Sequence, residues 1–172
     1  MTPRSPRGSV SKPPRPTNFG NVAPNPLDKW LDAEKEVSIL TATSNDALHP
    51  AENVLNGEEH TFWSTTGGFP QEIVLGFKQE IRIAEVRTVS VNIGSLSLQR
   101  VMPKKASIGL PEWKEVTVTE MSTDGADHQQ VESHKMNNVS TRFLKIAITK
   151  SLDPFAAIYS IHVQNSDGKW LC

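Results

Sequence analysis

The feature that most constrains the fold is a spacing of two between apolar residues, which recurs from Val37 almost to the end of the chain. Leu144, Ile146 and Ile148, for example, are separated by single residues of other kinds. Successive side chains of a β-strand point to opposite faces, so this spacing predicts strands with one apolar and one polar face. Further stretches of the same kind lie at residues 73–77, 89–93, 96–98, 116–118 and 159–163.

Turn signals built from Gly, Pro, Asn and Asp separate these stretches, and no helical pattern alternates with them. About eight short strands in this arrangement predict an all-β fold, an antiparallel β-sandwich or jelly roll. Between Ile83 and Val89 the apolar phase slips by one residue, through Val86. A slip of this kind predicts a β-bulge or a break in the strand.

The first part of the chain has a different composition. Seven of the twelve prolines fall within the first 26 residues, and residues 1–27 hold four basic side chains and no acidic one. So few apolar groups cannot offset the entropy of ordering the backbone. We therefore expect a disordered, basic, proline-rich tail over residues 1–34 and a folded domain over residues 35–172. A short helix is expected within residues 27–36, where Asp28 can act as a cap.

Charge and cysteine content narrow the classes of function. The formal net charge is −1, so the part that follows the basic tail is mildly acidic, which disfavours nucleic-acid binding. No apolar run has transmembrane length and none near Met1 resembles a signal peptide. We therefore expect a protein without membrane insertion that lies in the cytosol, the nucleus or a space continuous with the cytosol. Cys172 is the single cysteine, which excludes an internal disulfide and favours a reducing compartment.

The densest group of polar residues lies between His49 and Trp63. Pro50 is expected to start one helical turn that is anchored by Val54 and Leu55. Gly57 then permits a positive φ, and the chain returns to the core at Trp63.

Two interpretations of this loop remain open on chemistry alone. The side-chain oxygens of Asn53, Asn56 and Thr61, together with backbone carbonyls of the turn, are ligands that suit a hard cation such as calcium. The same residues also suit a turn rich in Asn that satisfies its own backbone hydrogen bonds.

No catalytic constellation is found in the sequence. The five histidines lack metal-ligand spacing, and Glu58 and Glu59 are adjacent acids in a turn with no apolar pocket to separate their pKa values. Cys172 is a terminal residue, a poor position for a preorganised nucleophile. No phosphate-binding loop or nucleophile elbow occurs. We therefore predict that the protein is not an enzyme.

The segment from Ala51 to Gly57, followed by Thr61-Phe62-Trp63, resembles the opening signature of discoidin (coagulation factor C-type) domains, which are jelly rolls. The string from Phe62 to Glu72 is more specific, and it is similar to the intraflagellar transport protein 25 family. Residues 142–146 and 153–161 also resemble that family, and the resemblance extends from Val37 to about Val163.

The resemblance implies a non-enzymatic subunit of the intraflagellar transport B particle, found in the cilium or flagellum and in the cytoplasm. The partners it implies are a Rab-like small GTPase, intraflagellar transport protein 27, and other B-particle subunits. It also implies calcium at Asn53, Asn56 and Thr61, although the family usually carries Asp at the position of Asn56. Loss of one formal charge should weaken a hard-cation site.

Contacts with the partner are expected from apolar and aromatic residues near turns, namely Phe69, Trp113 and Phe155. The alternative hypotheses are a discoidin-type module that binds calcium or carbohydrate at its strand-end loops, and a nuclear scaffold domain of the same fold for a ubiquitin ligase or repair complex. Extracellular discoidin domains close with a cysteine pair that this chain lacks, which disfavours sugar or lipid binding.

Overall fold

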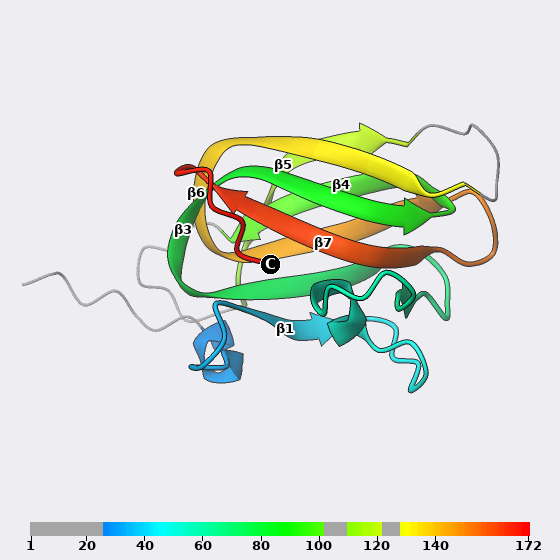
Figure 1. Ribbon diagram of the computed structural model, residues 1–172, viewed down its shortest axis with the longest axis horizontal. Helices are drawn as coiled ribbons and strands as arrows, with labels where there is room; N and C mark the ends of the chain where they lie inside the picture. Colours follow the sequence, from blue (N-terminus) through cyan, green and yellow to red (C-terminus); the bar gives the residue numbers. More distant parts are fainter. Residues whose placement is uncertain (1–25, 102–109, 122–127) are drawn as a thin grey trace, which may run out of the picture.

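The computed structural model describes residues 26–101, 110–121 and 128–172. In these ranges the chain forms strands and two short 3-10 helices, η1 (Pro26–Trp30) and η2 (Ala51–Leu55). The strands, shown in Figure 1, are β1 (Val37–Ala42), β2 (Trp63–Ser64), β3 (Gln71–Val91), β4 (Ile93–Val101), β5 (Trp113–Glu120), β6 (Gln130–Ser151) and β7 (Ala157–Asn165).

All strand pairs are antiparallel, and they build two layers. The first sheet contains β1, the first part of β3, the second part of β6, β4 and β5. The second sheet contains the first part of β6, the second part of β3, β7 and β2. This antiparallel sandwich confirms the predicted all-β class.

Two very long strands replace several of the short strands that the alternation predicts. β3 has 21 residues and β6 has 22, and each belongs to both sheets. Their mutual register shifts between Gly76 and Ile81 and again between Ile83 and Glu85. Such irregularities bend a strand without ending its pairing, so each strand passes from one sheet into the other, as its turn at the left of Figure 1 shows.

The second shift confirms the predicted bulge near Val86 and reverses the expected faces beyond it. Thr88 and Ser90 are fully buried, whereas Val89 is only half-buried. The expectation that Val89 begins an inward apolar face is therefore wrong, because Val86 has already taken the inward position. The hydroxyl of Thr88 is satisfied inside the protein by a 3.0 Å hydrogen bond with Nε2 of His134.

The hydrophobic core lies between the two sheets and is drawn from nearly every strand. Burial of one such aliphatic or aromatic side chain stabilises the fold by about 1.5–3 kcal/mol. The largest fully buried members of this core include Trp63, Ile73, Leu75, Phe77, Ile83, Ile93, Leu96, Leu98, Met136, Leu144 and Ile146.

Both ends of the described chain pack on the sandwich. Arg142 forms a 3.0 Å ion pair with Asp28 of η1. At the other end, the backbone N–H of Leu171 donates a 2.9 Å hydrogen bond to the carbonyl of Val163 and so covers part of the free edge of β7. The predicted tail lies mainly in residues 1–25, outside the described residues, and its boundary with the domain stays a prediction.

Among the residues that the structure describes, no helix has both the length and the apolarity needed to cross a membrane.

Candidate functional site: the Asn53–Thr61 loop and its surroundings

The loop after η2 has the local structure that its sequence predicts. Pro50 adopts the extended conformation that precedes a helical turn, and Val54 is buried against the core. Gly57 has a φ of 75°, in the left-handed region that favours glycine. Trp63 is completely buried in β2 and anchors the far end of the loop.

The structure brings the three predicted metal ligands together. Oδ1 of Asn56 accepts a 3.1 Å hydrogen bond from the hydroxyl of Thr61 and a 2.8 Å bond from the backbone N–H of Glu58. Nδ2 of Asn56 lies 3.5 Å from Oδ1 of Asn53. Nδ2 of Asn53 donates a 2.9 Å bond to the carbonyl of Phe62. The loop therefore carries both the clustered oxygens of the first interpretation and the internal hydrogen bonds of the second.

The donor set fits calcium in the type of its atoms. Oδ1 of Asn53, Oδ1 of Asn56 and the Thr61 hydroxyl are oxygens, as hard cations prefer, and the Glu58 carbonyl lies 3.1 Å from that hydroxyl. All four groups are uncharged, so a cation would have to replace hydrogen bonds without the attraction of a carboxylate. Across the described ranges, no three His, Cys, Asp or Glu side chains lie close enough together to hold a metal ion.

A buried polar network fixes the neighbouring loops to one another. Oε1 of Gln71 accepts 2.6 Å hydrogen bonds from the hydroxyls of Thr43 and Ser44, while its Nε2 donates a 2.6 Å bond to the carbonyl of Gly68. Gln71 is almost fully buried, and of its three partners Ser44 is buried with it, whereas Thr43 and Gly68 lie at the surface. The role of this side chain was not predicted, although Gln71 belongs to the specific string that ends at Glu72.

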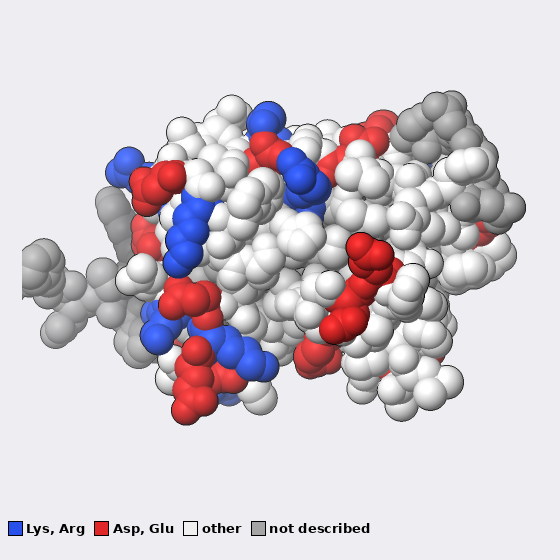
Figure 2. Space-filling model, viewed as in Figure 1, with Lys and Arg blue, Asp and Glu red and all other residues white. Residues whose placement is uncertain are grey.

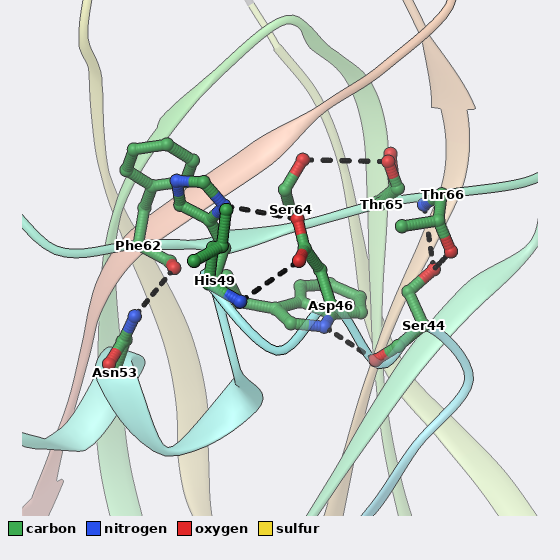
Figure 3. Close-up of polar contacts among 10 residues, drawn as sticks. Ser44, Asp46, His49, Asn53, Phe62, Ser64, Thr65 and Thr66 are labelled. Atoms are coloured by element: carbon green, nitrogen blue, oxygen red, sulfur yellow. Dashed lines mark hydrogen bonds and ion pairs between the residues drawn. The ribbon is translucent and has the colours of Figure 1, made fainter.

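Ser44 is the second centre of this network. Its hydroxyl accepts a 2.9 Å hydrogen bond from the backbone N–H of Thr66, and its carbonyl accepts a 2.9 Å bond from the indole Nε1 of Trp63. Figure 3 shows Ser44 facing Thr66 across the gap between the two loops. Thr65, the neighbour of Thr66, links this loop to the residue just before β7, because its hydroxyl accepts a 2.9 Å bond from the backbone N–H of Ala156.

An aromatic group that the sequence pattern did not reveal lies beside the loop. The rings of His49 and Phe62 stack with centroids 4.2 Å apart, and Tyr159 lies 5.2 Å from Phe62 (Figure 3 shows the first pair). Oδ2 of Asp46 lies within hydrogen-bonding distance of Nδ1 of His49, at 3.1 Å. Hydrogen bonds from the backbone N–H of Leu48 and from His49 lower the pKa of the Asp46 carboxyl.

The three predicted partner contacts lie in two different places. Phe69 packs against the core, in the loop before β3, and Phe155 is 51% exposed, in the loop before β7. Trp113 begins β5 on the first sheet, with the ammonium of Lys145 over its ring at 4.7 Å from the centroid. These residues do not form one surface, and their role in binding stays a prediction.

Two titratable side chains away from the loop are shielded from solvent, His134 fully and Cys172 in part. Nδ1 of His134 lies 2.9 Å from the hydroxyl of Thr119, and Nε2 lies 3.0 Å from that of Thr88, so both ring nitrogens have a partner. Burial lowers the pKa of this imidazole. Cys172 lies against the core at 3.5 Å from the carbonyl of Ile161, and burial raises the pKa of its thiol to about 11. Neither residue contacts the Asn53–Thr61 loop.

Comparison with known protein families agrees with this geometry. The F5/8 type C domain family matches residues 39–161, and the chain therefore belongs to this class of β-sandwich domains. Within the class, the chain belongs to the intraflagellar transport protein 25 family. It is 30% identical over 141 residues to the intraflagellar transport protein 25 homolog of Homo sapiens, covering 81% of this chain and 93% of that protein.

A second relative is the intraflagellar transport protein 25 of Chlamydomonas reinhardtii, which is 31% identical over 129 residues, or 75% of this chain. This chain spans 65% of the length of that relative.

Solved structures confirm the jelly-roll fold. The family 32 CBM from C. perfringens NanJ in complex with galactose has a TM-score of 0.62 at 15% identity, covering 74% of this chain and 93% of that one. Chitosan-binding module 2 from a Paenibacillus chitosanase/glucanase has a TM-score of 0.61 at 17% identity, covering 77% and 98%. At this identity the likeness concerns the fold alone, and it confirms the predicted discoidin-like architecture.

Proposed function

We propose that this chain is a non-enzymatic subunit of the intraflagellar transport B particle, acting in the cilium or flagellum and in the cytoplasm. It pairs with a Rab-like small GTPase, intraflagellar transport protein 27, and through this pair joins other B-particle subunits. The observation that carries the proposal is the 30% identity to the human relative over 93% of that protein's length.

The titratable groups that are buried or half-buried support binding rather than catalysis. The thiol of Cys172, with its raised pKa, is protonated at neutral pH. His134 is held between two threonine hydroxyls inside the sandwich, so neither nitrogen faces a substrate. Glu58 and Glu59 are both exposed, without the apolar surroundings that would tune a catalytic acid.

The outer face of the second sheet offers a surface for the partner. Val89 pairs with Val131 on one side and with Ser160 on the other, so these three residues lie side by side across β6, β3 and β7. Val131 is 62% exposed, and β7 contains no charged residue. Figure 2 shows an uncharged area between clusters of both signs on the face where β7 lies.

Depletion of charge with exposed aliphatic groups is characteristic of the centre of protein interfaces. We therefore assign the Val89–Val131–Ser160 surface as the GTPase-binding face, with Phe155 in the loop that leads into β7. When the partner binds, a charged side chain at the centre of this surface would lose its water without gaining an opposite charge, and this costs binding free energy.

Co-expression with the Rab-like GTPase followed by size-exclusion chromatography tests the function. We expect one peak of 1:1 stoichiometry for the natural sequence, loss of that peak for Val131→Asp, and weakening for Phe155→Asp. Val118→Asp is the matched control, because Val118 is 47% exposed on β5 of the opposite sheet. No complex with the natural sequence would overturn the proposal, and retention on a sugar array in that case would favour a carbohydrate-binding module.

A second candidate function is calcium binding by Asn53, Asn56 and Thr61, and the converging oxygens described above favour it. Bound cation would stabilise the folded chain in proportion to the logarithm of its concentration. We expect millimolar calcium to raise the unfolding temperature of the natural sequence and to leave that of Thr61→Val unchanged. An equal response of both chains, or none in either, would refute the assignment.

A further inference from the structure

Asn56 and Gly57 form an Asn-Gly pair, and the sequence contains no other. Both residues are exposed. In such a pair the backbone nitrogen of the glycine can attack the side-chain amide carbon of the asparagine, because glycine has no side chain to obstruct the approach. Exposed asparagines are for this reason among the chemically labile residues of proteins.

The turn leaves room for this approach. A Cβ placed on Gly57 would meet no atom within 4 Å, so the backbone around it is unobstructed. Asn56 has φ −85° and ψ −11°. Rotation about its Cα–C bond is needed to bring the Gly57 nitrogen against Cγ. Glycine at the next position permits that rotation, since it accepts both signs of φ.

The hydrogen bonds on Asn56 also favour the reaction. The backbone N–H of Glu58 and the hydroxyl of Thr61 both donate to Oδ1, at 2.8 and 3.1 Å. Negative charge develops on this oxygen when a nucleophile adds to Cγ, and a donor that still reaches Oδ1 after the rotation stabilises the addition.

We propose that Asn56 is a site of spontaneous deamidation, and that its aspartate product gives the loop the charge it needs to hold a hard divalent cation. The Gly57 nitrogen gives its proton to solvent and forms a bond to Cγ. The bond from Cγ to Nδ2 then breaks, and Nδ2 leaves as ammonia after taking up a proton. The result is a five-membered succinimide.

Water then opens the succinimide. Cleavage of the Cγ–nitrogen bond gives aspartate, and cleavage at the other carbonyl gives isoaspartate. The net change is addition of one water and loss of one ammonia, with no oxidation or reduction.

The aspartate places a carboxylate beside the hydroxyl of Thr61 and Oδ1 of Asn53. Affinity of an oxygen site for calcium rises with the number of its charged ligands. This second part of the inference rests on the candidate calcium function, whereas the deamidation itself does not. Neither part depends on the assignment to intraflagellar transport.

Peptide mapping of the full chain after prolonged incubation at mildly alkaline pH tests the modification. We expect a gain of about 1 Da at residue 56 that grows with time. Asn53, which is followed by Val54, serves as the internal control and should keep its amide. Asn56→Gln is the matched variant, because its longer side chain would have to close a larger ring, and it should show no gain. An unmodified Asn56, or an equal gain at Asn53, would overturn the proposal.

Calcium titration followed by thermal shift tests the consequence. Asn56→Asp and the aspartate form isolated after incubation should bind calcium at least about tenfold more tightly than the fresh chain. Equal affinity of the three would refute the link to cation binding, and it would do so independently of the mass gain. Asn56→Gln should respond no more strongly than the fresh chain.

Discussion

The hydroxyl of Ser44 donates a 2.6 Å hydrogen bond to Oε1 of Gln71, and both side chains are buried. The bond joins the loop after β1 to the first residue of β3, 27 positions along the chain. The carbonyl of Ser44 in turn accepts a hydrogen bond from the indole of Trp63. The end of the sandwich that holds the Asn53–Thr61 loop is therefore fixed by side chains as well as by the short pairing of β2 with β7.

Replacement of Gln71 by alanine should destabilise the protein by about 1–3 kcal/mol, because it leaves the buried Ser44 hydroxyl without its acceptor. Urea denaturation measures the change. Thr66→Val is the control, since the hydroxyl of Thr66 is exposed and makes one 3.2 Å bond to Ser44, and it should cost under about 1 kcal/mol. Similar losses for both variants would contradict the central role of Gln71.

Gly76→Ala should destabilise the packing of the segment after η1. A Cβ at this position would lie 2.5 Å from Cδ2 of Leu31 and 2.9 Å from Cδ2 of Leu40. Overpacking of this kind costs about 1–3 kcal/mol. Denaturant unfolding should show this loss for Gly76→Ala and almost none for Gly68→Ala, where a Cβ meets nothing within 4 Å. Adding Leu31→Ala to Gly76→Ala should recover part of the stability that Gly76→Ala loses. If the effects of the two substitutions on stability were simply additive, the proposed clash between residues 76 and 31 would be contradicted.

Stability should fall as the pH drops below 6.5, through His134. In the unfolded chain this imidazole titrates near 6.5, while burial lowers its pKa in the folded state and the nearby Glu85 carboxylate only partly opposes the shift. Below pH 6.5 the unfolded state therefore binds a proton that the folded state does not bind. The stabilising contribution of neutral His134 is complete above pH 6.5 and is lost as the pH falls below it.

Chemical denaturation on both sides of pH 6.5 measures the effect of His134. His134→Gln removes the titrating group while keeping an amide that can bond Thr88 and Thr119. This variant should lose the pH dependence over that range. A dependence that persists unchanged in His134→Gln would assign it to another group.

Cys172 should react slowly with thiol reagents in the folded protein. Burial raises its pKa from 9.0 to about 11, so the reactive thiolate is about 100-fold scarcer than in the unfolded chain at a pH below both values. Absorbance after addition of a disulfide reagent measures the rate with and without urea. Comparable rates in the two conditions would show that the thiol is accessible and unperturbed.

Local patterns in the sequence predicted a large part of the fold. The alternation around Leu144, Ile146 and Ile148 placed all three in the core, and the phase slip at Val86 identified a bulge that is present. Pro50 and Gly57 predicted the helical turn and its left-handed end. Each of these features depends on residues close in the chain, whose steric preferences act before any long-range contact forms.

Features that depend on distant partners were not predicted. The alternation suggested separate short strands, because it does not distinguish a strand end from a bend that keeps its pairing, as in β3 and β6. Thr88 was not expected in the core. Its hydroxyl can be buried because His134 lies opposite it, and that placement follows from the register between two strands. The pairing of half-buried Val89 with exposed Val131 on the outer face has the same origin.

The sequence by itself determined the β-sandwich class, the turn around Asn56 and the family resemblance, since side-chain alternation and turn chemistry are local properties. Only the tertiary structure decided that Asn53, Asn56 and Thr61 meet, that Gln71 joins two loops, and that the uncharged surface lies over β7. The physical reason is that register and bulges between strands far apart in the chain set which side chains share a face, and a shift of one residue moves each of them to the other side.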